Sequence, residues 1–590
     1  MDKQKTIFLA YFQINSAYKR INKMYFLLIL LFVSMPVWSA EYNGRYGWPI
    51  QKQPDKVIVC KPSRNLAELM LLESLSGLAA KAVNEGQFNE MIWIDTDNKA
   101  YQKIYRSTLK VLNISAVKEM DLWSLVDYLI KKKVIKGYIL YKLDKNSDHK
   151  VISDYSSNVA TVYAALLSGV MIDESLVKTA QLHRLKQLKD VRKESLEECF
   201  EKNKSKLNIC SALSVHPLVP NMRDYAIAHK LMLYADKKGL IEKVLEWITP
   251  MSPILGWGCG DEYDFTSLIS EWGHYNTASD WCINLPLISS VSGKVPLKKT
   301  NEKRLDDINF DDSSSFHSFV MSDGDNMQWT MGGFADSELY AGNKGVSSTG
   351  VSWTLCPINL SIISPFTWNE LAEKQYPRNS YIEYGGGYQY PDLFAVKRAN
   401  RKVLLRKFAQ RINYHLQAMD IKVFGFICRN VKSKEAQEAF QIYAEELKGI
   451  TGMLAVQYFP YELGGGIMWF KNGQGLDIPV ATATYSLWDE VNEDRPNCGT
   501  PEYVASLINR EVSGSKVKNV LSWTIVHAWS DFTNTSKASK LPAIGFNPIK
   551  AAENLLSDGI KTISANELLW RIRMKYKPDQ TKDLIKKAQD

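Results

Sequence analysis

Zinc-binding and redox motifs are missing from this sequence of 590 residues. The 8 cysteines include no C-x-x-C pair, and the 8 histidines include neither H-E-x-x-H nor H-x-x-x-H. The first absence excludes a zinc ribbon and a thioredoxin-like redox site, and the second excludes a zinc protease of the H-E-x-x-H type. The spaced acidic residues of an EF-hand calcium loop are missing as well. We therefore predict no metal site and no cofactor.

An excess of charge of one sign is missing too. The formal net charge is +9, and residues 1–40 contribute five basic residues and one acidic residue, so the remaining chain carries +5. A charge this small does not predict a nucleic-acid-binding surface. We therefore expect no nucleic-acid partner, and the sequence leaves the oligomeric state open.

The apolar run near the N-terminus is too short to span a membrane. Met24–Val33 follows three basic residues and precedes Pro36, and Ser39 and Ala40 supply small residues for cleavage. This pattern predicts a signal peptide over residues 1–40. We expect the mature protein in the periplasm or at the cell surface, with no membrane contact beyond the signal.

What the sequence has is the composition of a large globular protein rich in aromatic residues. Apolar residues make up 45% of it, with 16 tryptophans and 29 tyrosines. A chain of this length is too long for one ordinary core, so several domains are expected. Changes in periodicity predict, after the signal peptide, an N-terminal α/β domain (41–150), a second small α/β domain (151–214), a third α/β domain (215–299) and a C-terminal (β/α) barrel-like domain (300–590).

Strands alternate with helices in the first half of the chain. Lys56–Cys60, Met91–Ile94 and Val134–Tyr141 have the apolar bias of buried strands, and helical periodicity lies between them. Residues 185–200 read as a charged helical stretch. Such alternation predicts small parallel or mixed sheets covered by helices.

Eight strand candidates recur after residue 300, with helical patterns between most of them. They are Phe316–Met321, Gly350–Leu355, Tyr381–Tyr384, Val423–Cys428, Met453–Phe459, Ile478–Tyr485, Val520–Val526 and Ile560–Ser564. This pattern predicts a (β/α)8-like barrel, complete or distorted, and a seven-stranded barrel would leave nearly the same pattern. The predicted fold class is therefore α/β throughout.

One stretch around the third of these strands combines a carboxylate, glycines and tyrosines. Ser380–Tyr384 reads as a buried strand, Gly385–Gly387 permit backbone angles that side chains forbid, and Pro391 ends the strand pairing. Glu383 would then lie beside an open loop lined by tyrosines. Rings that stack on sugar faces and a carboxylate for acid and base chemistry suit a sugar site, whereas a tight turn with packed tyrosines is the simpler alternative.

The loop also carries a family motif. Residues 385–391 read G-G-G-Y-Q-Y-P and match the G-x-G-Y-x-Y-P motif of the GxGYxYP family. Two other segments, Gly256–Glu262 and Ser322–Asn326, also resemble segments of that family. The sequence resembles this family of glycoside hydrolases, which occurs in gut-type Bacteroidetes near polysaccharide-utilisation genes. The resemblance covers the chain after the signal and implies an enzyme acting on poly- or oligosaccharides. It implies no particular catalytic residues.

Active sites of (β/α) barrels lie at the carboxyl ends of the strands, and acids and aromatics follow five of the predicted strands here. In a two-carboxylate glycosidase one carboxyl protonates the leaving oxygen, while the other attacks carbon or activates water. We predict Glu383 as the general acid, because the nearby tyrosines desolvate it, and Asp325 or Asp323 as its partner. The predicted substrate-binding residues are Tyr388, Tyr390, Asn326, Trp329, Glu462, His527, Trp529 and Asp531.

Two other functions stay open at this point. Asp323, Asp325 and His527 are the ligand types of a metal-dependent deacetylase, although the missing H-x-x-x-H pair argues against one. A non-catalytic glycan-binding protein would keep the aromatic loop without cleaving its ligand. Asp261 and Glu262, after an apolar run in the third domain, are expected to cap the next helix, with a position facing the main site as the alternative.

Overall fold

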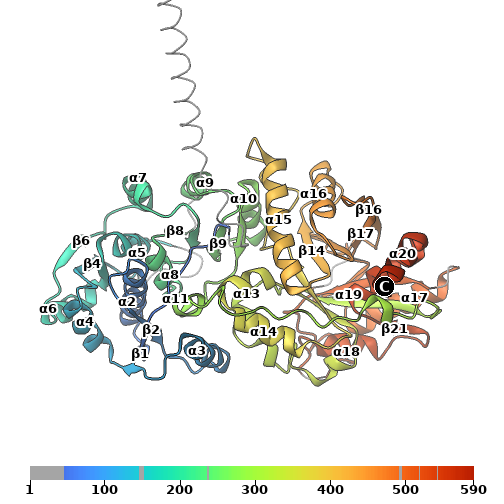
Figure 1. The fold of residues 1–590 in the computed structure, drawn as a ribbon, viewed down its shortest axis with the longest axis horizontal. Coiled ribbons are helices and arrows are strands. Elements are labelled where there is room, and N and C mark those ends of the chain that lie inside the picture. Colours follow the sequence, from blue (N-terminus) through green and yellow to red (C-terminus); the bar gives the residue numbers. More distant parts are fainter. Residues whose placement is uncertain are drawn as a thin grey trace, which may run out of the picture. The chain divides into compact units, whose positions relative to one another are not determined.

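Three small parallel sheets precede a larger curled sheet in the computed structural model (Figure 1). The structure describes residues 46–144, 152–235, 238–258, 260–490, 494–516, 519–540 and 542–589, so the predicted signal peptide lies outside the described residues. The α/β fold class is confirmed in all four sheets.

The first sheet has the strand order β2-β1-β3 and is parallel. Its elements are β1 (Lys56–Cys60), β2 (Glu90–Ile94), β3 (Lys118–Glu119), α2 (Leu66–Asn84), α3 (Lys99–Leu112) and α4 (Leu122–Lys131). The first two strands are the buried apolar runs that the sequence predicts.

The second sheet has the strand order β5-β4-β6. Its elements are β4 (Gly137–Tyr141), β5 (Gly169–Asp173), β6 (Gln187–Asp190), α5 (Ser156–Leu167), α6 (Val177–Leu182) and α7 (Leu196–Asn203). Although β4 lies before the proposed boundary at residue 150, it pairs with β5 and β6, so this sheet begins earlier than predicted. The predicted helix over residues 185–200 is wrong in its first half, which forms the edge strand β6.

The third sheet has the strand order β10-β9-β7-β8. Its elements are β7 (Ala212–Ser214), β8 (Met232–Tyr234), β9 (Pro253–Gly256), β10 (Tyr275–Thr277), α8 (Arg223–His229), α9 (Lys238–Trp247), α10 (Glu262–Glu271) and α11 (Leu285–Ser289). Helix α8 packs tightly on α2 of the first sheet, since a Cβ atom at Gly77 would lie 2.7 Å from the carbonyl oxygen of Asp224. Residues from Gly47 onward form one compact unit.

The curled sheet follows after residue 314, in the order β16-β17-β15-β14-β13-β12-β11-β20-β18-β19. Its strands are β11 (Ser315–Met321), β12 (Val351–Leu355), β13 (Ser380–Tyr384), β14 (Val423–Cys428), β15 (Gly452–Gln457), β16 (Ile467–Lys471), β17 (Asp477–Thr482), β18 (Tyr485–Leu487), β19 (Cys498–Gly499), β20 (Leu521–Val526) and β21 (Ile560–Thr562). Apart from the hairpin strand β16, the pairings are parallel. All eight predicted strands of this region are present.

Two strands near opposite ends of this order, β17 and β18, are consecutive in the chain. β17 pairs with β15 and β18 pairs with β20, and only Ala483 and Thr484 separate β17 from β18. The sheet therefore curls into a barrel-like form in which β17 and β18 act as one bent strand. The eighth predicted strand, β21, does not enter this ring. It pairs only with the first residues of β11, whereas β20 pairs with β11 along nearly its whole length and takes the neighbouring place in the sheet.

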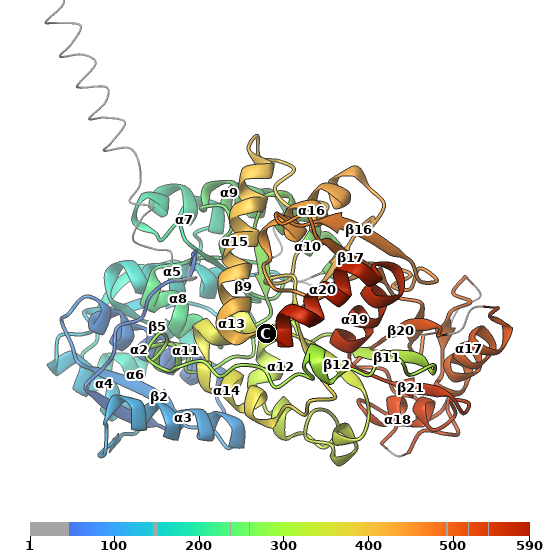
Figure 2. The ribbon, with the colours of Figure 1, turned by 45° about the vertical axis from the view of Figure 1, so that its right-hand side comes forward.

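Helices cover the outside of the curled sheet and close one of its ends (Figure 2). They are α12 (Met327–Met331), α13 (Pro357–Ile363), α14 (Pro365–Lys374), α15 (Arg401–Met419), α16 (Lys434–Glu446), α17 (Pro501–Gly514), α18 (Asn547–Glu553), α19 (Ala565–Tyr576) and α20 (Pro578–Gln589). Leu568, Leu569 and Ile572 of α19 belong to the same buried cluster as Phe316 and Leu454 of the inner sheet face. Helix α19 thus fills the barrel from the amino ends of its strands and leaves the carboxyl ends for a site.

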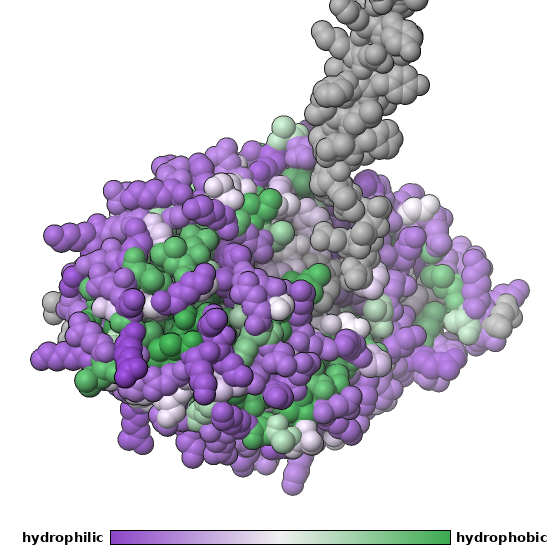
Figure 3. Space-filling view, turned by 60° about the vertical axis from the view of Figure 1, so that its left-hand side comes forward, coloured by the Kyte–Doolittle hydropathy of each residue, from purple (hydrophilic) through white to green (hydrophobic). Residues whose placement is uncertain are grey.

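The face drawn in Figure 3 is covered largely by hydrophilic side chains, with hydrophobic ones gathered in small areas between them. Among the described residues, no helix combines the length and the apolar character that a membrane crossing requires.

Candidate active site

The glycine motif forms a tight loop that has no room for side chains. Gly385, Gly386 and Gly387 have φ angles of 78°, 77° and 115°, in the left-handed region that glycine alone adopts readily. A Cβ atom at Gly386 would lie 2.6 Å from Ile412 of α15, and one at Gly387 would lie 2.1 Å from the ring of Tyr275. The loop is therefore wedged between a helix of the barrel and the third small sheet.

The residues after the glycines join the third sheet to the barrel. The main chains of Tyr388 and Asn276 of β10 exchange two hydrogen bonds, at 2.8 and 2.9 Å. The backbone N–H of Tyr390 donates to Ser270 Oγ of α10 at 2.9 Å. As a result, the motif holds α10 and the preceding β9 loop against the carboxyl ends of the barrel strands.

Helix α10 presents Glu262 to this junction. Asp261 caps the helix by accepting hydrogen bonds from the N–H groups of Tyr263 and Asp264, at 2.7 and 3.3 Å, as the sequence predicts. Glu262 faces the barrel instead, where its Oε1 accepts a hydrogen bond from the hydroxyl of Tyr388. The ring of Trp257, in the β9 loop, stacks on Tyr388 with a centroid distance of 6.3 Å and an interplanar angle of 5°.

The turn after β11 supplies two more carboxyls. Asp323 adopts a left-handed φ of 67°, which Asp tolerates better than most residues, and its Oδ2 accepts hydrogen bonds from the hydroxyl of Ser322 and the N–H of Ala528. Gly324 is required next, because a Cβ atom there would lie 1.5 Å from the carbonyl oxygen of Thr354. Asp325 follows on the other side of this sharp turn.

Glu262, Asp323 and Asp325 lie close enough for their charges to interact. Burial raises the pKa of Asp325 well above its ordinary value, and repulsion from Asp323 and then from Glu262 raises it further. Burial likewise raises the pKa of Glu262. The hydrogen bond from Tyr388 acts to lower this pKa, and the charge of Asp323 acts to raise it. Because like charges in a confined space disfavour joint ionisation, Asp325 and Glu262 hold their protons at a higher pH than isolated carboxyls do.

Aromatic side chains wall this carboxyl cluster. Tyr461 stacks on Trp488 at 4.7 Å, and Trp488 stacks on His527 at 3.6 Å with an interplanar angle of 4°. The pKa of His527 is lowered, because the effect of burial outweighs the charge of Asp323, which acts to raise it. The ring of Tyr458 packs against the rings of Tyr461 and Tyr390, with centroid distances of 5.5 and 5.9 Å. The wall thus runs from the motif tyrosines to the loops after β15, β18 and β20.

An open pocket of about 640 Å³ adjoins the cluster. The residues that line it are Trp257, Asp280, Trp281, Asn326, Gln328, Trp329, Gly332, Gly333, Phe334, Ser337 and Trp529. Asn326 of this group caps α12 by accepting a hydrogen bond from the N–H of Trp329 at 3.1 Å. Three of the predicted substrate-binding residues, Asn326, Trp329 and Trp529, therefore meet in one pocket.

Three other predicted site residues make contacts within the protein that hold its structure together and do not line the pocket. Glu383 has no exposed surface, and its carboxyl accepts hydrogen bonds from the N–H groups of Ile358 and Gly386, at 2.9 and 3.2 Å. Burial raises its pKa to about 8. Glu462 forms a buried ion pair with Arg495 at 2.9 Å. Asp531 is exposed and accepts hydrogen bonds from Thr533 in its own turn.

The position of Glu383 follows from the alternation of strand residues. Ile382 and Tyr384 of β13 belong to the inner cluster, so Glu383 between them points to the helix-covered face. Its carboxyl holds the first turn of α13 and the glycine loop together. We therefore propose a structural role for Glu383 and place the chemistry at the carboxyls on the open side.

The predicted site residues do not include Trp257, Trp281 or Trp488, although Trp488 is one of the aromatics that follow the predicted strands, and Glu262 is treated chiefly as a capping residue. The G-W-G-x-x-D-E segment offered a signal for Trp257 and Glu262, since both sit in it. Only the long-range hydrogen bonds of the motif to β10 and α10 place that segment beside the barrel, so the sequence could not rank it. Among the described residues, no group of three or more histidine, cysteine, aspartate or glutamate side chains is arranged to hold a metal ion.

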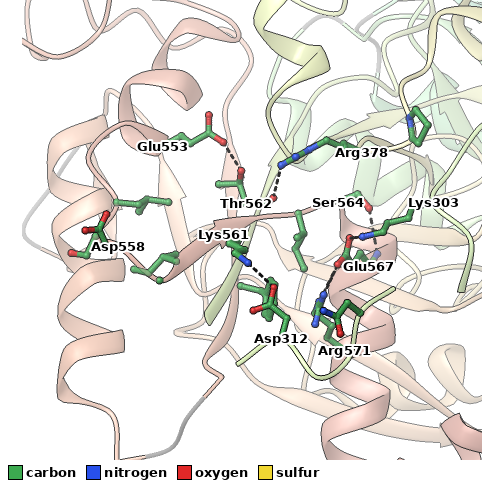
Figure 4. Close-up of a pocket in the computed structure, with 18 residues that line it drawn as sticks. Lys303, Asp312, Arg378, Glu553, Asp558, Lys561, Thr562, Ser564, Glu567 and Arg571 are labelled. Atoms are coloured by element: carbon green, nitrogen blue, oxygen red, sulfur yellow. Dashed lines mark hydrogen bonds and ion pairs between the residues drawn. The ribbon is translucent and has the colours of Figure 1, made fainter. Parts of the chain in front are cut away.

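A second pocket, of about 760 Å³, lies at the opposite end of the barrel, around the amino ends of β11 and β21 (Figure 4). Five of its charged side chains pair with one another: Lys303 and Arg571 both bind Glu567, at 3.1 and 2.7 Å, and Lys561 binds Asp312 at 2.6 Å. In barrels of this kind residues at this end serve stability, and the paired charges fit that role.

Comparison with known proteins adds three matching family models. They are "GxGYxYP_N second domain" over residues 135–207, "GxGYxYP third domain" over residues 208–290 and "GxGYxYP putative glycoside hydrolase C-terminal domain" over residues 314–540. Together they cover more than half of the chain, including Glu262, Asp323, Asp325 and the glycine motif. No curated protein matches the chain.

Among solved structures, the chain is similar to one described as a "putative hydrolase" from Bacteroides thetaiotaomicron VPI-5482. The TM-score is 0.73 at 18% sequence identity, over 90% of this chain and 97% of that chain. At this identity the likeness concerns the fold, and it extends across both the small sheets and the barrel.

Proposed function

Because this chain belongs to the GxGYxYP family, whose C-terminal domain is described as a "putative glycoside hydrolase" domain, we propose that it is a hydrolase that cleaves glycosidic bonds in poly- or oligosaccharides. The observation that carries the proposal is the interacting cluster of Glu262, Asp323 and Asp325, set between stacked aromatic rings at the carboxyl ends of the barrel strands. Glycoside hydrolysis needs two carboxyl groups in different protonation states, with rings to hold the sugar.

Asp325 is the proposed general acid. Its raised pKa keeps the proton on the carboxyl at a pH where an ordinary aspartate has lost it. The proton passes to the glycosidic oxygen as the bond from that oxygen to the anomeric carbon breaks. The leaving sugar then departs as a neutral alcohol.

Asp323 is the proposed second carboxylate. The hydroxyl of Ser322 and the N–H of Ala528 donate hydrogen bonds to its Oδ2 and so fix the orientation of its carboxyl. It either attacks the anomeric carbon, with water later releasing the sugar, or removes a proton from the water that attacks. In both routes one water molecule is consumed and the proton lost by Asp325 is regained.

Glu262 is proposed as a positioning residue that acts through Asp325. Its negative charge raises the pKa of Asp325, and Tyr388 of the family motif fixes the orientation of its carboxyl. The motif would then contribute to catalysis by holding a carboxyl of another domain in place. The non-catalytic alternative has no feature that favours it over this arrangement of carboxyls.

The test is release of reducing sugar from a panel of plant, microbial and host glycans by the purified protein, with and without chelator. We expect chelator-independent release that falls about 10²–10⁴-fold in Asp325→Asn, the range of general acid catalysis. The loss should be smaller for aryl glycosides whose leaving group needs no proton. Asp264→Asn, an exposed carboxyl of α10, is the matched control and should keep full activity.

Two results would contradict this assignment. Full activity in Asp325→Asn would remove it as the acid, and loss of activity in a well-folded Glu383→Gln protein would return that role to Glu383. Release of acetate from acetylated glycans, without new reducing ends and lost on addition of chelator, would instead favour the metal-dependent deacetylase.

We also propose export to the periplasm or cell surface, on the strength of the N-terminal sequence pattern alone. N-terminal sequencing of the protein from cell fractions should then find a chain starting near Glu41 outside the cytoplasm. A cytoplasmic protein that retains residues 1–40 would refute it.

A further inference from the structure

Four tryptophans line the open pocket beside the carboxyl cluster: Trp257, Trp281, Trp329 and Trp529. Two residues that line the pocket connect it to the proposed catalytic groups. Asn326 in its wall directly follows Asp325, and Trp257 stacks on the tyrosine that binds Glu262. A ligand in this pocket therefore lies next to the reacting bond.

Two of these rings face solvent. Trp281 is 73% exposed and Trp529 is 45% exposed, whereas large aromatic side chains are normally buried for most of their area. The main chain of Trp281 is held at this position, because its backbone N–H donates to the side-chain oxygen of Gln328 at 2.6 Å and its backbone carbonyl accepts from Asn221 at 3.1 Å. The ring of Trp529 packs on the ring of Trp329, with 4.6 Å between the ring centroids. A ring held by such packing before binding loses little entropy when a flat apolar face stacks on it.

Charge restricts what this pocket accepts. Of the described residues that line it, Asp280 is ionisable and none is a lysine or arginine. The adjoining cluster adds three carboxyls. A uronate or sulfated sugar would find no cation to pair with and would be repelled, while an uncharged sugar meets neither obstacle.

We propose that this tryptophan pocket binds the pyranose rings of an uncharged oligosaccharide next to the ring at which cleavage occurs. The inference rests on the proposed glycosidase function and adds to it the substrate class, a neutral chain of several sugars. Trp281 and Trp529 supply the stacking surfaces, and the absence of cations in the lining excludes acidic glycans.

Binding to the Asp325→Asn protein, which would not consume its ligand, tests this without requiring turnover. The probes are uncharged hexasaccharides with glucose, galactose, mannose or xylose backbones, and hexagalacturonate as the acidic counterpart, measured by calorimetry at two salt concentrations. At least one uncharged probe should bind, tighter than its disaccharide and independently of salt. Trp281→Ala and Trp529→Ala should each weaken it about 10-fold, the scale of one aromatic contact.

Tyr414→Ala removes a ring on α15 that is 45% exposed and remote from the pocket, and should leave binding unchanged. The pocket proposal is overturned if uncharged probes bind equally well to both tryptophan variants, or if hexagalacturonate binds as tightly as they do. Either result leaves the glycosidase proposal standing when the wild-type protein still releases sugar. Failure of every uncharged probe to bind overturns the pocket proposal, and absence of sugar release in addition overturns both.

Discussion

At the scale of single residues, the protonation of Asp325 depends on groups far from it in sequence. Glu262 is on a helix of the third small sheet, yet its charge contributes to the raised pKa of Asp325. Tyr388 in turn binds Glu262, and burial raises the pKa of this tyrosine well above its ordinary value, so its hydroxyl stays protonated and donates. Three segments of chain therefore set the state of one proton.

A pH profile tests this dependence. The acid works while Asp325 is protonated, so kcat/KM falls as pH rises through its pKa. Glu262→Gln removes a negative charge that raises that pKa, so the pKa falls and the alkaline limb should move to lower pH, by about one unit if the coupling is about 1.4 kcal/mol. Rates from pH 4 to 9 would measure it, with Asp264→Asn as control. A limb that stays in place, or moves to higher pH, would refute the coupling.

At the scale of elements, the glycine loop is the most constrained piece of the site. Gly387→Ala would combine a φ of 115° with a Cβ atom 2.1 Å from Tyr275, so we expect a loss of about 1–3 kcal/mol in the free energy of unfolding. Gly514→Ala is the matched control, because a Cβ atom there meets nothing within 4 Å and the residue ends helix α17. Urea unfolding of both variants would decide, and equal stability would show that the loop can rearrange.

The sequence predicts elements well where burial alone decides their pattern. The apolar runs that become β11 to β15 are visible because both faces of these strands are covered. β6 is not visible, because three of its four residues, Gln187, Lys189 and Asp190, are polar and the strand lies mostly exposed at a sheet edge, held by pairing with β4. The exclusion of β21 from the ring is likewise a matter of pairing, which no local pattern reveals.

The same covering of both faces explains why the sequence could not place Glu383. In a strand with one wet face, alternation separates inward from outward positions, but all five residues of β13 are buried. A glutamate there reads equally well as a site residue or as a buried ligand of backbone N–H groups. The Asp323 and Asp325 turn was predictable because the strand end and the glycine between them are local features.

At the scale of the whole molecule, the proposed site is shared between the barrel and the third small sheet. Cutting the chain between the third small sheet and β11 should therefore not separate them. Gly293 is an exposed position where a Cβ atom meets nothing within 4 Å, so a protease site can be built there. We expect the cut halves to elute together and retain activity, because backbone hydrogen bonds such as those of Asn276 with Tyr388 hold them. Halves that separate on gel filtration without denaturant would contradict this.

The pairing of Asn276 with Tyr388 also bears on how such proteins arise and diverge. A barrel that carries the three glycines but loses its third small sheet would keep a loop of glycines with no neighbouring sheet to pack against. Recombination that exchanges one domain without the other should thus be selected against, and the two should be inherited together. The glycine-tyrosine motif would then identify proteins that have inherited both domains. A genome search with this motif would find the domain pair whether or not each protein still has its catalytic activity.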